Sequence, residues 1–182
     1  MQSIATIVSA VLVIVAGIAL IPIREIASEP SNAEGPLSSV AFAAPFIAAG
    51  VVALLGEYRA KPIYSVAAGV ALLPISLVSF ILIPLLIPAI LVIGMGLSRL
   101  SAPSNLDIGV SIVLTVGLVV AFAALLVHQD PTSWSTPTAS GSSSDIVTTT
   151  EATLSLTIVA AVLAVAALVG RHPRASRPAA QT

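Results

Sequence analysis

The chain has 182 residues, of which 57% are hydrophobic and only 8% are charged. Soluble domains carry about 25% charged residues, and a soluble fold of about 150 residues leaves about 30% of its unfolded-chain surface in water. The composition therefore excludes an ordinary soluble enzyme, a nucleic-acid-binding protein and a disordered chain, and it predicts a protein embedded in lipid. The net charge of −1 supplies no basic field, and the absence of cysteine excludes disulfides and thiol chemistry.

Apolar segments long enough to cross a membrane recur along the chain, since a crossing helix needs about 20 apolar residues. The first two cover about 4–23 and 37–56, and a loop rich in glutamate and proline separates them. The first segment is too long for a signal peptide and has no basic residues before it, which favours a retained span over a cleaved one. Two later spans are predicted at about 108–127 and 152–170.

Residues 64–97 form an uncharged run of 34 residues, and this run poses the main question of topology. One straight helix of this length would measure about 51 Å, against a hydrocarbon core of about 30 Å. Prolines also interrupt the run, and proline kinks or breaks a helix. We therefore expect a helical hairpin that turns near Pro84, with arms at about 63–83 and 85–98. The second arm is short, so a re-entrant hairpin is a further possibility.

The basic residues orient these spans, because Lys and Arg concentrate on the cytoplasmic side of a membrane. With six spans and the N-terminus inside, only Arg24 lies outside, and the six other bases lie inside: Arg59, Lys61, Arg99, Arg171, Arg174 and Arg177. With five spans and one long, proline-kinked third helix, the best orientation leaves Arg59 and Lys61 outside. The charge distribution favours six spans, and five remain the alternative.

The predicted fold is thus an all-α, polytopic transmembrane bundle in which residues 1–182 form a single domain. Both arrangements place 129–150 outside the cell membrane and the basic tail, 171–182, in the cytoplasm. The segment 129–150 is rich in Ser and Thr and has no hydrophobic periodicity, so we expect it to be a flexible loop.

Two groups of residues are candidates for a site. Glu57, Arg59 and Lys61 could contact a lipid headgroup or the charged face of a partner, although they could equally end the second span and set its orientation. The second group follows the expected hairpin turn, where a broken helix could bind a substrate through free backbone groups, near Ser76 and Ser79. Close packing of a hairpin would explain this group as well; it comprises Pro84, Pro88, Gly94 and Gly96.

No predicted span contains an ionisable residue in its interior. Such residues usually mark proton relays and ion paths, so the sequence argues against a proton-coupled pump, an antiporter or a voltage sensor. It predicts no catalytic residue, no cofactor and no metal site. Small residues recur four apart, as at Ala160 and Ala164, and this spacing allows helices to approach closely in lipid.

We expect a non-enzymatic accessory or scaffold subunit that acts through helix packing. Its partners would be the lipid bilayer and either a second copy of the chain or another membrane protein, and nucleic acid is excluded. One alternative is a permease or channel for a neutral or apolar solute, which would use the hairpin at Pro84 and Pro88. The other is a lipid-handling enzyme, which the absence of catalytic groups disfavours.

Overall fold

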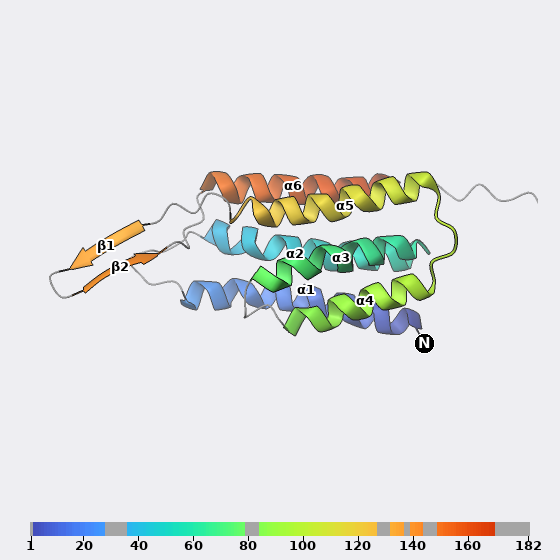
Figure 1. Ribbon diagram of the computed structural model, residues 1–182, viewed down its shortest axis with the longest axis horizontal. Coiled ribbons are helices and arrows are strands. Elements are labelled where there is room, and N and C mark those ends of the chain that lie inside the picture. The colour runs from blue at the N-terminus through green and yellow to red at the C-terminus, as the bar shows by residue number, and fades with distance from the viewer. Residues whose placement is uncertain are drawn as a thin grey trace, which may run out of the picture.

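The computed structural model describes residues 2–27, 36–78, 84–126, 132–136, 139–143 and 149–169. Within these ranges the chain forms six helices that run side by side as a bundle (Figure 1). They are α1 (Gln2–Ala27), α2 (Pro36–Tyr58), α3 (Pro62–Val78), α4 (Leu86–Ser98), α5 (Asn105–Ala123) and α6 (Thr149–Val169). The expectation of a helical bundle is confirmed.

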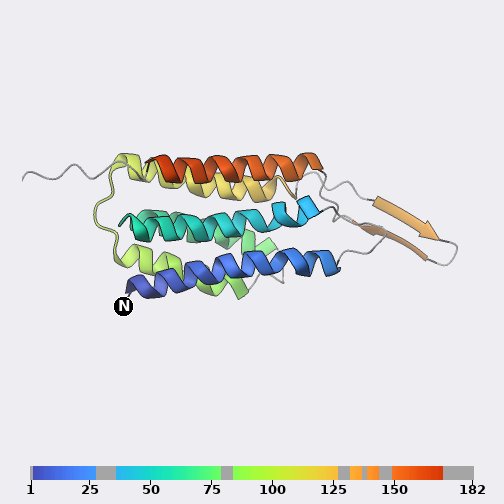
Figure 2. The ribbon, with the colours of Figure 1, turned by 180° about the vertical axis from the view of Figure 1, so that it is seen from behind.

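The helices are arranged in layers. α2 and α3 pack together in the middle, α1 and α4 cover one side, and α5 and α6 cover the other (Figures 1 and 2). Within the outer layers, α1 contacts α4 and α5 contacts α6. α2 is consequently the most enclosed of the long helices, with 67% of its apolar stretch buried, against 28% for α1, α5 and α6.

Four of the described helices are long and apolar enough to cross a membrane: α1, α2, α5 and α6. α3 and α4 are apolar but shorter, with 17 and 13 residues. The outward face of α1 carries eight large aliphatic side chains between Ile4 and Ile23, a surface that suits hydrocarbon rather than water. These features indicate a membrane-embedded protein. By helix length, four helices qualify as membrane spans, and α3 and α4 are too short to qualify.

The long uncharged run folds as two helices and not as one. α3 and α4 are antiparallel and lie very close, because glycines face the neighbouring backbone. A Cβ atom on Gly69 would lie 2.9 Å from the carbonyl oxygen of Ala89, and one on Gly96 would lie 3.1 Å from that of Pro62. Residues 79–83, which include part of the expected first arm and Ser79, lie outside the described residues.

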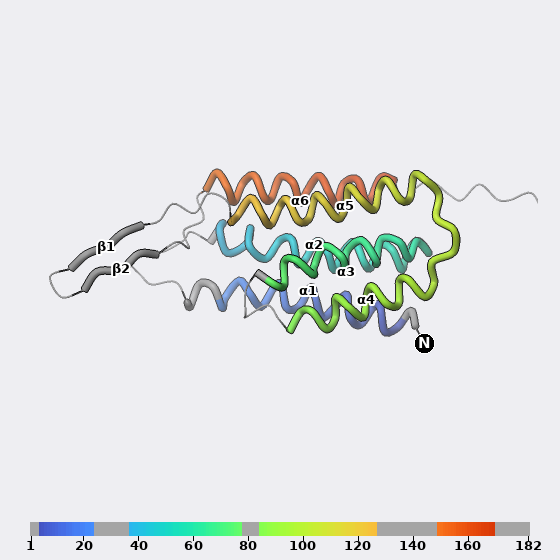
Figure 3. The backbone as a smooth tube through the Cα atoms, viewed as in Figure 1, coloured from blue at the N-terminus to red at the C-terminus, as the bar shows by residue number. Residues whose placement is uncertain are grey.

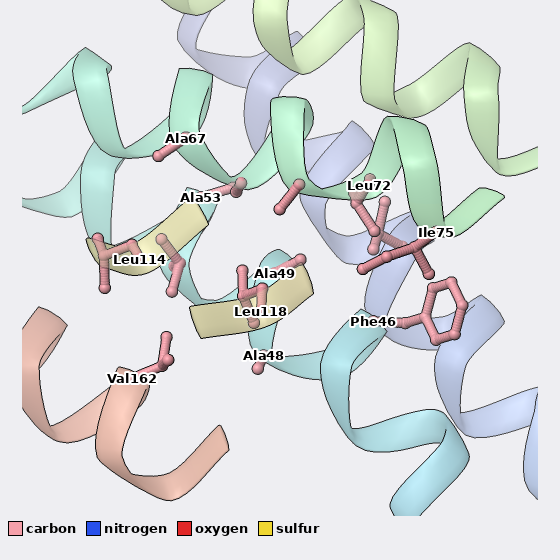
Figure 4. Packing of buried hydrophobic residues seen from close by; sticks show 14 of the residues in the cluster. Phe46, Ala48, Ala49, Ala53, Ala67, Leu72, Ile75, Leu114, Leu118 and Val162 are labelled. Carbon is pink, nitrogen blue, oxygen red and sulfur yellow. The ribbon is translucent and has the colours of Figure 1, made fainter. Parts of the chain in front are cut away.

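The core is built from small and large apolar side chains that alternate across the layers. Figure 4 shows Phe46 of α2, Ile75 of α3, Leu118 of α5 and Val162 of α6, all members of one buried cluster. Alanines of α2 let the neighbouring helices approach its backbone. The Phe46 ring also contacts Phe122 edge to face, with a centroid separation of 5.8 Å.

The segment 129–150 corrects one expectation. It contains two short antiparallel strands, β1 (Thr132–Thr136) and β2 (Ala139–Ser143), with Trp134 paired to Gly141. Its Ser, Thr and Gly content predicted a loop throughout. Thr132, Trp134 and Thr136 are β-branched or aromatic residues at every second position, and such residues favour a strand. The overall Ser and Thr content of the segment hid this alternation.

Candidate functional site

One end of the bundle gathers most of the described ionisable side chains, and we call it the charged end. The start of α1, the α2–α3 turn, the end of α4 and the start of α5 all meet there (Figure 3). Its members are Glu57, Arg59, Lys61, Arg99 and Asp107, which come from different parts of the chain.

Arg99 connects three helices. Its Nη1 donates to Oε2 of Glu57 at 2.8 Å, and its Nη2 donates to the other carboxylate oxygen and to the hydroxyl of Thr6, the latter at 2.8 Å. Its Nε donates to the Met95 carbonyl one turn earlier in α4. Hydrogen bonding to Glu57 is the main cause that raises the pKa of Arg99, so the guanidinium stays charged. The end of α4 is thereby tied to α2 and α1.

Lys61 and Asp107 form a second ion pair, which joins the α2–α3 turn to the start of α5. Lys61 Nζ lies 2.8 Å from Asp107 Oδ1, and the two side chains are 12% and 22% exposed. Ser104 holds the carboxylate in place, because its hydroxyl donates to Asp107 Oδ2 and accepts from the Asp107 amide. This reciprocal arrangement caps α5. Lys61 also lies 5.6 Å from the ring of the buried Tyr64.

Arg59 binds the end of α6. Its Nη1 donates to the carbonyl oxygens of Ala166 and Ala167 at 3.1 and 2.9 Å. Both belong to the last turn of α6, whose carbonyls have no donor within the helix. A cation at this position also complements the negative end of the helix dipole. The contact links residues 107 positions apart and fixes α6 against the α2–α3 turn.

The tight α2–α3 turn brings these cations into place. Ala60 adopts a left-handed conformation with φ of 52°. The amide of Lys61 then donates to the Gly56 carbonyl, and that of Ala60 to the Glu57 carbonyl, as in a Schellman motif. Pro62 follows as the first residue of α3, where its missing amide hydrogen costs nothing. The polar turn seen in the sequence is thus a helix stop and an immediate restart.

The three residues of the first predicted group have different partners in the structure. Glu57, Arg59 and Lys61 lie at the same end, yet each one reaches a different helix: α4, α6 and α5. The sequence missed their partners, Arg99 and Asp107. The signal was available, since opposite charges at span ends on the same side of a membrane can meet. All three residues have partners within the chain, so lipid headgroups would compete with existing contacts.

The structure places the second predicted group at the start of α4 and on two of its sides. Pro84 precedes α4 in a short 3₁₀ turn, and Pro88 lies in the first turn of α4, where no amide donor is required. Gly96 packs against Pro62 and Val66 of α3, whereas a Cβ on Gly94 would meet no atom within 4 Å. Gly94 and Gly96 therefore face different sides of α4.

One acidic residue has a different environment from the one that the sequence indicated. Glu151 was placed outside the last span, but α6 begins at Thr149 and includes it. Glu151 is only 7% exposed and lies on the buried face of α6 with Ala152 and Ser155. The helix starts earlier than hydropathy suggested because threonine and glutamate at its first turn are compatible with helix and with its dipole.

Comparison with protein-family models, with curated proteins and with solved structures finds no significant match to this chain. Among the residues that the structure describes, no three His, Cys, Asp or Glu side chains gather as metal ligands would. The contacts of the charged end connect α1, α2 and α4 with one another and join the α2–α3 turn to α5 and α6.

Proposed function

We propose that all six helices lie across the membrane and that the charged end faces the cytoplasm. Arg59, Lys61 and Arg99 all lie at this end, as the preference of basic residues for the cytoplasmic side requires. The first helix, α1, starts at this end and the last helix, α6, ends there. Both ends of the helical part of the chain would therefore lie on the cytoplasmic side. α4 is about 20 Å long, and a thinned bilayer or the residues before it would complete its crossing.

Single-cysteine labelling tests this topology directly, because the chain has no cysteine of its own. Tyr58→Cys and Ser101→Cys report on the charged end, where Tyr58 is 88% exposed, and Thr149→Cys reports on the opposite end. In intact cells, a membrane-impermeant maleimide should label only Thr149→Cys, and permeabilisation should expose the other two. Labelling of Tyr58→Cys in intact cells would overturn the proposed topology: labelling of Tyr58→Cys without Ser101→Cys is the pattern expected of five spans, and labelling of both would reverse the orientation.

We further propose that the protein is an accessory or scaffold subunit that binds a transmembrane helix of another membrane protein. The observation that carries this proposal is the outward face of α6. Its exposed residues are mainly small, whereas those of α1 are large and aliphatic. Small residues let helix backbones approach closely in lipid, where packing drives association. The face consists of Thr153, Thr157, Ala160, Ala161 and Ala164, with Leu154 and Leu168 beside it.

The hydroxyls on this face do not require a partner of their own. Thr153 Oγ1 donates to the Thr149 carbonyl, and Thr157 Oγ1 donates to the Thr153 carbonyl, both at 2.7 Å. Because both hydroxyls are bonded within α6, the face presents small, weakly polar groups to a neighbouring helix. The charged end supports the same role, since its ion pairs hold the helices to one another and keep the α6 face in a fixed orientation.

Photocrosslinking tests the α6 face. A photoreactive amino acid is placed at Ala164 on α6, and a control is placed at Leu12, which is 54% exposed on α1. In native membranes, the Ala164 position should capture a discrete protein partner and the Leu12 position should capture mainly lipid. Equal capture from both positions would overturn the assignment of the α6 face. A crosslinked dimer of the chain itself would replace the accessory role by self-association.

A further inference from the structure

Among the residues that the structure describes, one cation of the charged end has no carboxylate partner. Arg99 pairs with Glu57, and Lys61 pairs with Asp107. Arg59 is bonded instead to carbonyl oxygens at the end of α6. That helix end carries about half a negative charge, which offsets the guanidinium only in part. The described charged end therefore keeps an excess of positive charge at Arg59.

The guanidinium of Arg59 also has an edge that the protein does not use. Both of its hydrogen bonds come from Nη1, and Nε and Nη2 have no acceptor among the described residues. These two nitrogens share one edge and hold their N–H groups in parallel, an arrangement that binds two oxygens of a carboxylate or phosphate. A phosphate on this edge would leave the Nη1 contacts with α6 intact and would not compete with them.

An apolar stripe on α2 leads to Arg59. Every third or fourth residue of α2 is at least partly exposed, whereas most residues between them are buried. α2 packs against α1 on one side and against α6 on the other (Figure 2). In a membrane, the exposed stripe meets the acyl chains of lipids. Its members are Val40, Ala44, Ile47, Val51, Leu54 and Tyr58.

We propose that the phosphate of an anionic phospholipid binds the Nε–Nη2 edge of Arg59, with its acyl chains along the α2 stripe. A lipid fits better than a soluble anion because the unpaired cation directly follows the apolar stripe. Tyr58 is 88% exposed at the same end, and aromatic rings in such positions lie at the level of lipid headgroups.

The sequence after α6 favours an anionic lipid over a neutral one. Basic residues that follow a membrane helix closely attract anionic headgroups. Here the residues are Arg171, Arg174 and Arg177. Binding of the lipid does not depend on which side of the membrane the charged end faces, so it can be tested separately from the proposed topology.

Native mass spectrometry of the purified full-length protein in detergent tests the proposal. The protein is offered equal amounts of phosphatidylglycerol and phosphatidylcholine with identical acyl chains. We expect the first bound lipid to be phosphatidylglycerol by about fivefold. Equal binding of the two lipids would overturn the proposal and leave water or an acidic segment of a partner as the acceptor for Arg59.

Glycerophosphoglycerol, the same headgroup without acyl chains, separates a lipid from a soluble phosphate compound. At a concentration equal to that of the lipid, it should not displace bound phosphatidylglycerol, because it cannot contact the α2 stripe. Full displacement would show that the site recognises the phosphate alone, and it would overturn the assignment to a lipid.

Matched variants assign the site to Arg59. Arg59→Gln should reduce the preference for phosphatidylglycerol to less than about twofold. Arg177→Gln removes the same charge from the tail and should keep a preference of about fivefold. An undiminished preference in Arg59→Gln, or an equal loss in Arg177→Gln, would contradict the assignment.

Arg59→Lys separates lipid binding from support of α6. Lysine keeps the charge and can still donate to the α6 carbonyls, but it lacks the two parallel N–H groups. We expect normal hydrogen-exchange protection at the end of α6 together with an intermediate lipid preference. A full preference in Arg59→Lys would show that charge alone binds the lipid and would overturn the role of the Nε–Nη2 edge.

Discussion

Arg99 and Glu57 are 42 residues apart in the chain, yet the guanidinium of Arg99 binds both carboxylate oxygens of Glu57. Their side chains are 26% and 6% exposed, so the pair is largely withdrawn from solvent. Fork-shaped pairing of this kind combines charge with fixed geometry. It joins the end of α4 to the end of α2, and through Thr6 it also holds the start of α1.

The first prediction concerns this pair. Glu57→Gln should lower the free energy of unfolding by about 1–3 kcal/mol, because it leaves the Arg99 charge partly buried without its counter-ion. Arg99→Gln should cost a similar amount for the opposite reason. The double variant should cost less than the two single variants together, by about 1–2 kcal/mol. Unfolding in detergent measures all three.

Tyr58→Phe is the control for that cycle, since Tyr58 neighbours Glu57 in sequence but is 88% exposed. It should change stability by less than about 0.5 kcal/mol. If the losses of stability in Glu57→Gln and Arg99→Gln simply add in the double variant, the two side chains are not coupled. The ion pair would then not hold α4 to α2.

The second prediction concerns Arg59. Arg59→Ala removes the donor that satisfies the Ala166 and Ala167 carbonyls, so the last turn of α6 should fray. We expect a global loss of about 1 kcal/mol. Hydrogen exchange should quicken at the end of α6 more than in α5, and this local pattern distinguishes the contact from general destabilisation. Uniform exchange in both helices would contradict the role.

The third prediction concerns the α2–α3 turn. Ala60 has a φ of 52°, a conformation that costs residues with a Cβ atom about 1–2 kcal/mol. Ala60→Gly should therefore raise the melting temperature and stabilise the fold by about 1 kcal/mol. Ala60→Val should lower it, because a β-branched side chain is strained there. A melting temperature unchanged by both substitutions would show that the turn relaxes without this strain.

The fourth prediction concerns helix contacts at glycine. Gly50→Ala and Gly69→Ala place a Cβ within 3 Å of the carbonyls of Ala10 and Ala89, so each should cost about 1–3 kcal/mol. Gly94→Ala meets no atom within 4 Å and should be neutral or stabilising by up to about 1 kcal/mol. Unfolding curves of the three variants check this order. Equal effects at Gly69 and Gly94 would show that α3 and α4 are not in close contact.

Much of the fold could be predicted from local sequence. Apolar length located α1, α2, α5 and α6, and prolines with excess length divided the run from 64 to 97 into two helices. Side-chain partners could not be predicted in this way. Lys61 meets Asp107 and Arg59 meets Ala166 only because α5 and α6 pack beside the α2–α3 turn, and that packing depends on contacts across the whole bundle.

The scarcity of charge and the length of the apolar runs determined that this protein is a membrane-embedded helical bundle, because a helix satisfies its own backbone hydrogen bonds in lipid. The sequence also placed the few charged residues at or beyond the ends of the predicted spans. The tertiary structure decided what those charges do, since ion pairs form between helices that are remote in sequence. It decided as well that Glu151 is buried, and that α6 presents a small-residue face, because exposure depends on neighbours and not on residue type.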